Sequence, residues 1–367
     1  MPPLVDSAAL SGLALFAIVL TFASALPPPA PTLTFASLIA PAPPLRHDAC
    51  AVWIAAPHTP CFDLTDTPCA PDTMPPALTD AFSMGGAVDT SHSMVIDDTM
   101  GGKGSRYGAS EESVTALALA ASARHARLAA AAAAAGSYHA LAASLSATGF
   151  HDRKDLLRIA LLAVNASRPG GLAALAPAAV FGSMSPWIEA ELLALGLDAV
   201  TTVEYNTLNY RATSITTLTP DQLATNIADG THTPFGLAIS LSSFDHDGLG
   251  RYGDPLSPSA DLDIMAALAD CILAPHGVLV VSVPVGSDQL VWNMHRRYGP
   301  ARLPSLLAPF LPALDPSPLI PLVDASSVLG WDSDARLSQD RPFTSSYEPV
   351  FILSPLDQAP LHTDREL

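Results

Sequence analysis

A regular alternation of short apolar runs and helical stretches begins near Leu172 and continues to about Leu353. Continuous apolar runs are typical of parallel strands that are buried on both faces. The runs that we expect to be strands are Ala178–Phe181, Ala199–Val203, Ile215–Leu218, Phe235–Leu241, Val278–Val283, Leu319–Val323 and Val350–Leu353. The helices expected between them are Trp187–Leu195, Asp221–Ile227 and Asp261–Leu273. Strands that alternate with helices predict an α/β fold with a doubly wound, mostly parallel, Rossmann-like sheet.

A long N-terminal extension that is rich in proline and alanine precedes this region. Residues 7–26 carry no charge and are long enough to span a bilayer, and Ala23-Ser-Ala25 has the pattern of a signal-peptide cleavage site. We therefore expect a signal peptide or a membrane-tethering signal-anchor at 1–30, and a lumenal or single-pass membrane location in the secretory pathway. Because Asp6 is acidic and no Lys or Arg precedes Arg46, a buried or disordered leader on a cytoplasmic protein is the alternative.

The rest of the chain divides by composition into four parts. We expect a Pro/Gly-rich linker at 31–110, with a short ordered piece at Ala51–Ile54, and a helical segment at 111–170. Alanine and the acidic pair at Glu111 and Glu112 favour a helix at the start of that segment. The α/β domain then spans 171–355, and a short tail covers 356–367.

The overall composition bounds the possible partners and metal sites. Hydrophobic residues are 49% of the 367 residues and the net charge is −18, so a nucleic-acid partner is not expected, since phosphate binding needs a basic face. The four cysteines are Cys50, Cys61, Cys69 and Cys271. They form no C-x-x-C pair, and no metal site is expected. One disulfide among the first three and unpaired thiols are both open.

Two polar segments follow neighbouring predicted strands. Ser242–Pro255 follows Phe235–Leu241 and places acidic and basic side chains between glycines, and Gly286–Arg302 follows Val278–Val283. Loops after adjacent strands of such a sheet converge at its carboxyl edge, where ligands bind. The segments therefore predict a small-molecule site.

The turn after the first predicted strand indicates a nucleotide-type site. Gly182 and Ser183 form that turn, and Glu204 follows the second strand, where an acid can bond a ribose hydroxyl. A dinucleotide site has three glycines in this turn, so a single glycine favours a smaller adenosine ligand such as S-adenosylmethionine. The alternative is that Gly182 only makes the turn and Glu204 is a capping or surface acid.

Several longer motifs resemble one family. They are Phe181–Glu189, Thr201–Asn206, His246–Pro255, Val283–Gly286 and Asn293–Pro300. In these motifs the region from Leu172 to Ser354 resembles the uncharacterised domain of unknown function 268 family. That family is similar in its sheet to class I S-adenosylmethionine-dependent methyltransferases. The run Leu241–His246 resembles the motif at the fourth strand of that superfamily, which implies a cofactor-binding role for Asp245.

The remaining polar residues have candidate roles in catalysis and substrate binding. His246 or His295 could accept a proton near neutral pH, with Asp247 as a base or an orienting carboxylate. The arginines suggest an anionic acceptor. The candidate substrate-binding residues are Arg251, Asp254, Asn293, Arg296, Arg297 and Tyr298. Internal salt bridges of a compact loop, and aromatic cover of the sheet edge, are the alternative explanation for these residues.

The function predicted from these features is that of an S-adenosylmethionine-dependent methyltransferase-like protein. It would act on a small anionic or sugar-type acceptor at the carboxyl edge of the sheet. The alternative is a non-catalytic, glycan-binding or nucleotide-sugar-binding member of the fold that has lost the methyl donor.

Overall fold

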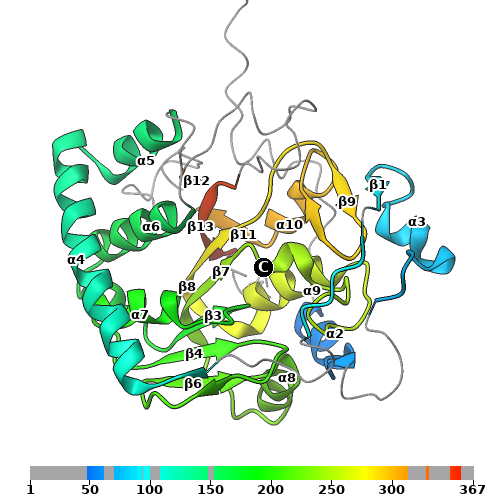
Figure 1. Cartoon of the computed structure of the whole chain (residues 1–367), viewed down its shortest axis with the longest axis horizontal. Helices are drawn as coiled ribbons and strands as arrows, with labels where there is room; N and C mark the ends of the chain where they lie inside the picture. Colours follow the sequence, from blue (N-terminus) through cyan, green and yellow to red (C-terminus); the bar gives the residue numbers. More distant parts are fainter. Residues whose placement is uncertain are drawn as a thin grey trace, which may run out of the picture. The chain divides into compact units, whose positions relative to one another are not determined.

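The computed structural model describes residues 48–61, 70–92, 94–99, 108–147, 153–312, 328–329 and 348–356. All of them belong to one compact unit, Leu33–Leu367. The predicted leader at 1–30, nearly all of the predicted tail and the strand expected at Leu319–Val323 lie outside the described residues. The expected α/β unit is drawn in Figure 1.

The predicted apolar runs form the parallel part of an eight-stranded sheet. The parallel strands, in spatial order, are β6 (Ile215–Leu218), β4 (Val200–Val203), β3 (Ala178–Phe181), β7 (Phe235–Leu241) and β8 (Leu273–Ser282). The order continues with β13 (Val350–Pro355) and β11 (Phe310–Pro312), and β12 (Val328–Leu329) also pairs with β13. Because β13 is antiparallel to β8, β11 and β12, the fold is α/β with a mixed sheet.

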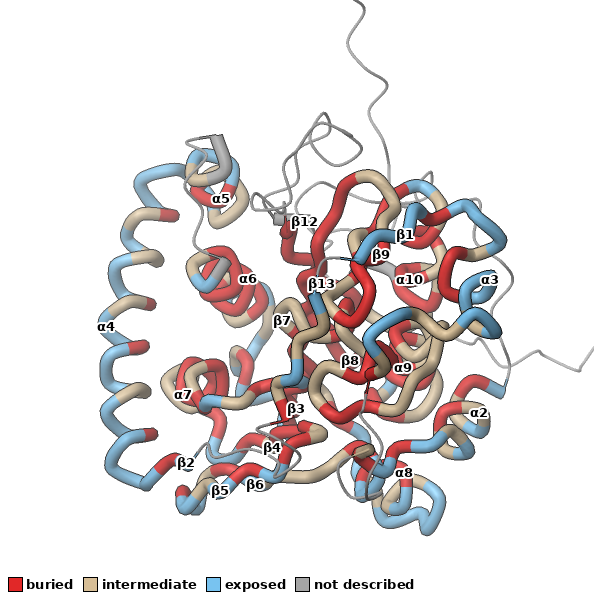
Figure 2. Tube along the Cα trace, turned by 45° about the vertical axis from the view of Figure 1, so that its right-hand side comes forward, coloured by how far each residue is buried: buried red, intermediate tan, exposed pale blue. Residues whose placement is uncertain are grey.

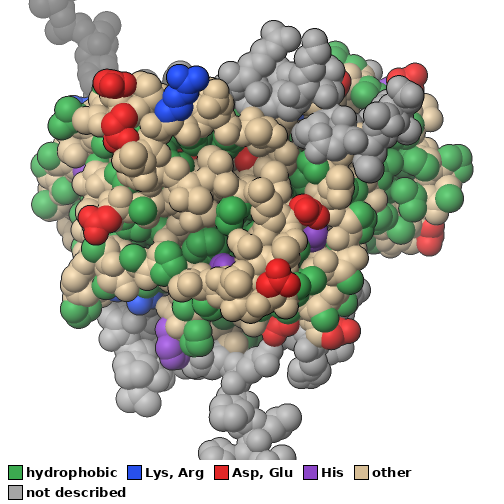
Figure 3. All heavy atoms as spheres, turned by 90° about the horizontal axis from the view of Figure 1, so that it is seen from below, with side chains coloured by type: hydrophobic (Ala, Val, Ile, Leu, Met, Phe, Trp, Pro, Cys, Tyr) green, Lys and Arg blue, Asp and Glu red, His purple; other side chains and the backbone are tan. Residues whose placement is uncertain are grey.

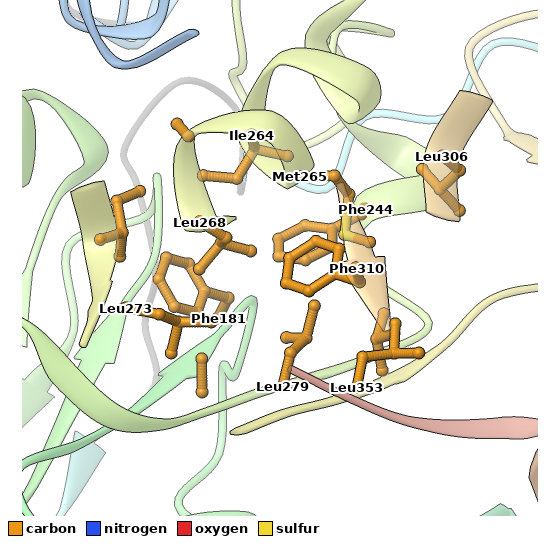
Figure 4. Packing of buried hydrophobic residues seen from close by; sticks show 14 of the residues in the cluster. Phe181, Phe244, Ile264, Met265, Leu268, Leu273, Leu279, Leu306, Phe310 and Leu353 are labelled. Atoms are coloured by element: carbon orange, nitrogen blue, oxygen red, sulfur yellow. The ribbon is translucent and has the colours of Figure 1, made fainter. Parts of the chain in front are cut away.

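Helices and apolar side chains cover both faces of this sheet. Helices α4 (Glu111–Ala135), α5 (Tyr138–Ala147), α6 (Arg153–Ser167) and α7 (Trp187–Ala194) belong to one face, and α8 (Pro220–Ala228), α9 (Ala260–Ala267) and α10 (Leu303–Leu307) to the other. Along β3 the side chains alternate between the two cores, with Val180 in the first and Phe181 in the second. In the second core Phe181 and Phe244 lie near Ile264 (Figure 4).

Local signals set the helix boundaries that frame the site. Ser110 caps α4 by accepting a hydrogen bond from Ser113 N, and the helix ends at Gly136 with φ of 92°. One side of α4 is buried and the other faces solvent (Figure 2). Thr219 and Gln222 form a capping box at the start of α8. Helix α7 begins at Trp187, as expected, and Pro186 is its N-cap residue.

A second, small sheet holds the polar segment that follows β8. It contains β1 (Asp89–Ser91), β9 (Gln289–Val291) and β10 (His295–Arg297), in the order β1-β9-β10. A separate two-stranded pairing joins β2 (Gly108–Ala109) to β5 (Asn209–Tyr210). A satellite core containing Phe82 and Trp292 packs beneath the small sheet, with their rings edge to face. Chain from the expected linker is thereby built into the α/β unit.

Helix α2 (Ala49–Ala55) also lies within the expected linker and includes the ordered piece predicted at Ala51–Ile54. It packs against α8 and α9 (Figure 1). A disulfide joins Cys50 to Cys271, and Cys50 N donates a hydrogen bond to Asp270 Oδ2 at 2.9 Å. Cys61 is also disulfide-bonded, and the described residues contain no free cysteine. The disulfide of Cys50 thus reaches across the chain to Cys271, a partner outside the first three cysteines.

The described residues contain no single helix with the length and hydropathy of a membrane span. Helices Glu111–Ala135 and Tyr138–Leu145 would meet both criteria only as a pair, and they are bent by 96° relative to each other. The predicted span at residues 7–26 is outside the described part of the chain.

Candidate functional site

A pocket opens at the carboxyl ends of β3, β4 and β7. Its floor comes from the ends of the three strands, at Phe181–Gly182, Val203–Tyr205 and Ser242–Phe244, and Trp53 and His58 from the segment around α2 complete its wall. Strand order reverses between β3 and β7, because the chain proceeds to β4 and β6 on one side and to β8 on the other. Crevices at such a reversal are the usual ligand sites of open α/β sheets. The enclosed space measures about 120 Å³.

Gly182 lets the end of β7 approach the first turn closely. Its φ is +74°, and a Cβ at this position would lie 1.8 Å from Ser243 Oγ and 2.4 Å from Ser243 Cβ. The Gly182 N–H donates to Val203 O at 2.9 Å. The glycine is therefore required both for its backbone conformation and for contact with a neighbouring side chain.

Glu204 presents a buried carboxyl group to the pocket. It is 7% exposed, and its Oε1 accepts hydrogen bonds from Asn206 N at 3.1 Å and Asn206 Nδ2 at 3.3 Å. Burial raises the pKa of Glu204 to about 7 against these hydrogen bonds, which lower it. Gly182 and Glu204 thus line one pocket, as the sequence predicted for their positions.

Ser183 makes internal hydrogen bonds and does not line this pocket. Its hydroxyl lies 2.8 Å from Ser185 O and 3.1 Å from Glu189 Oε2, and Thr202 Oγ1 donates to Glu189 Oε1 at 2.6 Å. Burial raises the pKa of Glu189 to about 7. The Ser183 side chain therefore serves to join α7 to the sheet beside the turn.

His246 connects the loop after β7 to the segment after β8. Its Nδ1 lies 2.5 Å from Met294 O, so this nitrogen carries the proton in the neutral ring. Its Nε2 lies 3.5 Å from Oδ2 of Asp245, which is fully buried. Burial, and then the nearby Arg251, lower the pKa of His246 to about 4. The ring is therefore neutral at pH 7, with Nε2 able to accept a proton.

Two further acids come from the same loop. Asp247 lines the pocket, and burial together with Asp254 raises its pKa well above the usual range. Asp254 also lines the pocket, but its Oδ2 accepts from Gly250 N at 2.8 Å and its Oδ1 from Tyr252 N at 3.1 Å. Asp254 therefore fixes the loop's shape, which is one of the two roles that we considered for it.

The predicted substrate-binding arginines contact other parts of the protein. Arg251 Nε donates to Asp98 Oδ2 at 2.7 Å, Arg296 Nη1 to Asp247 O at 2.5 Å, and Arg297 Nε to Ser287 O at 2.8 Å. None of the three lines the pocket. Their contacts are the internal contacts that we considered as the alternative explanation for these arginines.

The other predicted residues of the segment after β8 also lie away from the pocket lining. Asn293, at φ of 59°, accepts from Ile96 N at 2.5 Å and donates to Leu249 O at 3.4 Å. Tyr298 is fully buried and donates to Asp261 Oδ2 at 2.9 Å. The ring of His295 stacks on His246 at 6.3 Å between centroids. Burial, and then the nearby His246, lower the pKa of His295 to about 4.

Several pocket residues were not singled out from the sequence. Trp53 and His58 come from the segment around α2, and their rings lie 4.5 Å apart. Tyr205 follows Glu204 directly, and Tyr252 lies in the loop after β7. A tryptophan within a short apolar run of a proline-rich stretch was the one sequence signal that could have indicated this wall. In the part of the chain that the structure describes, no group of three or more His, Cys, Asp or Glu is arranged to hold a metal.

Part of the chain matches the model of a protein family whose function is unknown. Residues 176–311 match the family model described as "Caenorhabditis protein of unknown function, DUF268". This match confirms the resemblance to the domain of unknown function 268 family over those residues, which include β3 and the polar loop after β7. No curated protein matches the chain.

Proposed function

We propose that this chain is an S-adenosylmethionine-dependent methyltransferase-like protein that binds the donor between the Gly182 turn and Glu204. The observation that carries the proposal is the convergence of these two positions on one pocket at the strand-order reversal. The five parallel strands have the order 3-2-1-4-5 when numbered along the chain, which supports a doubly wound, Rossmann-like core with an added antiparallel edge.

The chemistry of the pocket lining fits this donor. Glu204 offers a carboxyl group to ribose hydroxyls, and Phe181, Phe244 and Ile264 are among the apolar walls available to a planar base. Among the described residues that line the pocket are Glu204, Asp247, Asp254 and Asp263, and none is Lys or Arg. The Glu204 carboxyl group, whose pKa is raised to about 7, would attract a positively charged ligand once it ionises.

The donor, when bound, supplies an electrophilic methyl group on a positively charged sulfur. The protein's part is to orient the ligands and to hold the proton of a hydroxyl or amine acceptor. His246 Nε2 is unprotonated at pH 7, because Nδ1–H is held by Met294 O, and it is the candidate to take that proton, as a weak base whose pKa is lowered to about 4. Asp245, 3.5 Å away, would then stabilise the imidazolium.

Isothermal titration calorimetry on the full chain tests the proposal. S-Adenosylmethionine and S-adenosylhomocysteine should bind with micromolar affinity, and Glu204→Gln should weaken both by about tenfold, a loss of about 1.4 kcal/mol. Asp229→Asn is the matched control, because Asp229 is an exposed carboxylate that does not line the pocket. Absence of binding by folded wild-type protein would remove the methyl donor from the proposal.

One observation favours a second candidate, a glycan- or nucleotide-sugar-binding protein that has lost the donor. The space beside Gly182, where a ligand could approach the backbone closely, contains the Ser243 side chain. A nucleotide sugar such as UDP-glucose that bound in the calorimeter, with no response to S-adenosylhomocysteine, would support this candidate.

A location in the secretory pathway belongs to the same proposal. The disulfide between Cys50 and Cys271, and the disulfide-bonded state of Cys61, are typical of proteins that fold in an oxidising compartment.

A further inference from the structure

A second hollow, of about 460 Å³, adjoins the proposed donor pocket at the Gly182 turn. Five residues line both, and these are Gly182, Met184, Ser242, His246 and Tyr252. The second hollow then extends between the start of α6 and the start of α7, where Lys154 and Trp187 line it. A ligand there would contact residues that also line the donor pocket.

The two hollows differ in the ionisable residues that line them. The donor pocket is lined by four acidic side chains, and among its described lining residues there is no Lys or Arg. In the second hollow the pattern is reversed, since Lys154 is present and no Asp or Glu is among the residues described as lining it. The chain has only 17 Lys and Arg against 35 Asp and Glu, so a local reversal of sign distinguishes this hollow from the average surface.

A neighbouring hollow shares Lys154 and Trp187 and adds Arg124 and Arg158, with Asp155 and Glu191 as its acids. The Lys154 ammonium lies 5.1 Å, and the Arg158 guanidinium 5.8 Å, from the centroid of the Trp187 ring. The indole therefore lies near two cations, of which Lys154 lines the second hollow and Arg158 is paired with Asp155 and Glu191.

The hollow also carries groups that suit a hydroxylated ligand. Ser185 and Ser242 contribute hydroxyl groups, and Tyr252 contributes a phenol whose pKa is raised by burial to about 12, so that it remains a donor at neutral pH. His246 borders the hollow with its proton-accepting ring.

We propose that the second hollow is the acceptor site and that it takes a small hydroxylated molecule with a carboxylate or phosphate group bound at Lys154. This inference rests on the proposed function, because it assigns the neighbouring pocket to the donor. The anionic group of the acceptor would then bind Lys154, at the start of α6, and not the arginines after β8, which contact protein groups.

The test is a ligand titration of the full chain followed by NMR, with D-glucuronate, D-glucose and inorganic phosphate as probes. Glucuronate and phosphate should bind at millimolar concentrations, and the neutral glucose should bind more weakly than glucuronate. Lys154→Gln should weaken glucuronate binding by about tenfold, which corresponds to about 1.4 kcal/mol, and Lys154→Arg should retain it. Arg127→Gln, which removes an exposed cation of α4 that does not line the hollow, is the matched control.

Three outcomes of the anion and glucose titrations would overturn the inference. They are equal affinity for glucuronate and glucose, an unchanged glucuronate affinity in Lys154→Gln, and no binding of either anion to folded wild-type protein. Calorimetry of S-adenosylhomocysteine on the same variants separates the two proposals, and Lys154→Gln should bind it like wild type. If Lys154→Gln lost affinity for S-adenosylhomocysteine to the same extent as for glucuronate, Lys154 would bind the carboxylate of the donor, and the acceptor site would be overturned. If neither the wild-type protein nor any variant bound S-adenosylhomocysteine while anion binding was intact, the proposed function would be contradicted instead.

Discussion

The disulfide between Cys50 and Cys271 ties helix α2, with the pocket residue Trp53, to the segment that leads into β8. It closes a loop with a sequence separation of 221 residues. The segment after α2 is also held, since Cys61 N donates to Gly253 O at 2.8 Å. One wall of the proposed donor pocket is therefore attached covalently to the sheet.

Removing this disulfide should loosen that wall. The double substitution Cys50→Ser with Cys271→Ser should lower the free energy of unfolding by about 2–4 kcal/mol, because the unfolded chain loses a long cross-link. Calorimetric affinity for S-adenosylhomocysteine should fall as well. A variant that bound the ligand like wild type while showing the loss of stability would mean that α2 contributes nothing to binding.

Substitution of Gly182 should damage the turn itself. Gly182→Ala places a Cβ 1.8 Å from Ser243 Oγ at a φ of +74°, so we expect a loss of about 1–3 kcal/mol in urea denaturation from overpacking. Ser243→Gly should recover part of this loss in the double variant, because it removes the clashing atoms. If the two substitutions changed the free energy of unfolding additively, the predicted clash with the Ser243 side chain would be contradicted.

The acidic pocket should discriminate between charged and neutral ligands in a pH-dependent manner. The pKa of Glu204 is raised to about 7, so its carboxylate forms as the pH increases between about 6 and 8. Over that range the affinity for the sulfonium S-adenosylmethionine should rise relative to that for neutral S-adenosylhomocysteine. Calorimetry at several pH values measures the ratio of the two affinities, and in Glu204→Gln this ratio should not change with pH.

The buried carboxyl of Glu189 should produce a slope of stability with pH. Its pKa is raised to about 7 from 4.5, so the folded state holds a proton that the unfolded state releases. The free energy of unfolding should therefore fall as the pH rises between about 4.5 and 7, by at most about 3 kcal/mol from this group. Urea titrations of Glu189→Gln should show a shallower slope than wild type, and an identical slope would contradict this origin.

The arginine after β8 that binds Asp261 should have a structural role. Arg302 and Asp261 form a bidentate pair at 2.8 and 2.5 Å, and both are buried. Arg302→Met should cost about 3–5 kcal/mol, because it leaves a buried carboxylate without this partner. Phosphate affinity, followed by NMR, should not change in the folded fraction. A stable variant with weakened phosphate binding would contradict this structural role and would make Arg302 an acceptor-binding residue.

The parallel strands could be predicted because apolar runs such as Phe235–Leu241 are buried on both faces and need no alternation. The antiparallel edge could not, since the apolar run at Val350–Leu353 carries no sign of its direction. Gly182 and Glu204 were predicted from their positions at strand ends. The wall that contains Trp53 was missed, because α2 depends on a disulfide to Cys271 that sequence spacing does not reveal.

The arginines near Gly286–Arg302 make internal contacts for a physical reason, and their role in acceptor binding stays a prediction. In an acidic chain the basic residues near Gly286–Arg302 are needed to neutralise buried carboxylates and to satisfy backbone carbonyls, as Arg296 does for Asp247 O. Lys154 was not singled out, because it lies on a helix far from the polar loops in sequence, and only the fold brings it to the Gly182 turn.

A crystal structure of the full chain with S-adenosylhomocysteine would test most directly whether a nucleoside binds beside Glu204. We predict that the ribose hydroxyls lie within hydrogen-bonding distance of the Glu204 carboxyl and that the sulfur lies on the Gly182 side of the pocket. A ligand bound elsewhere, or a donor pocket that excludes it at saturating concentration, would contradict the account.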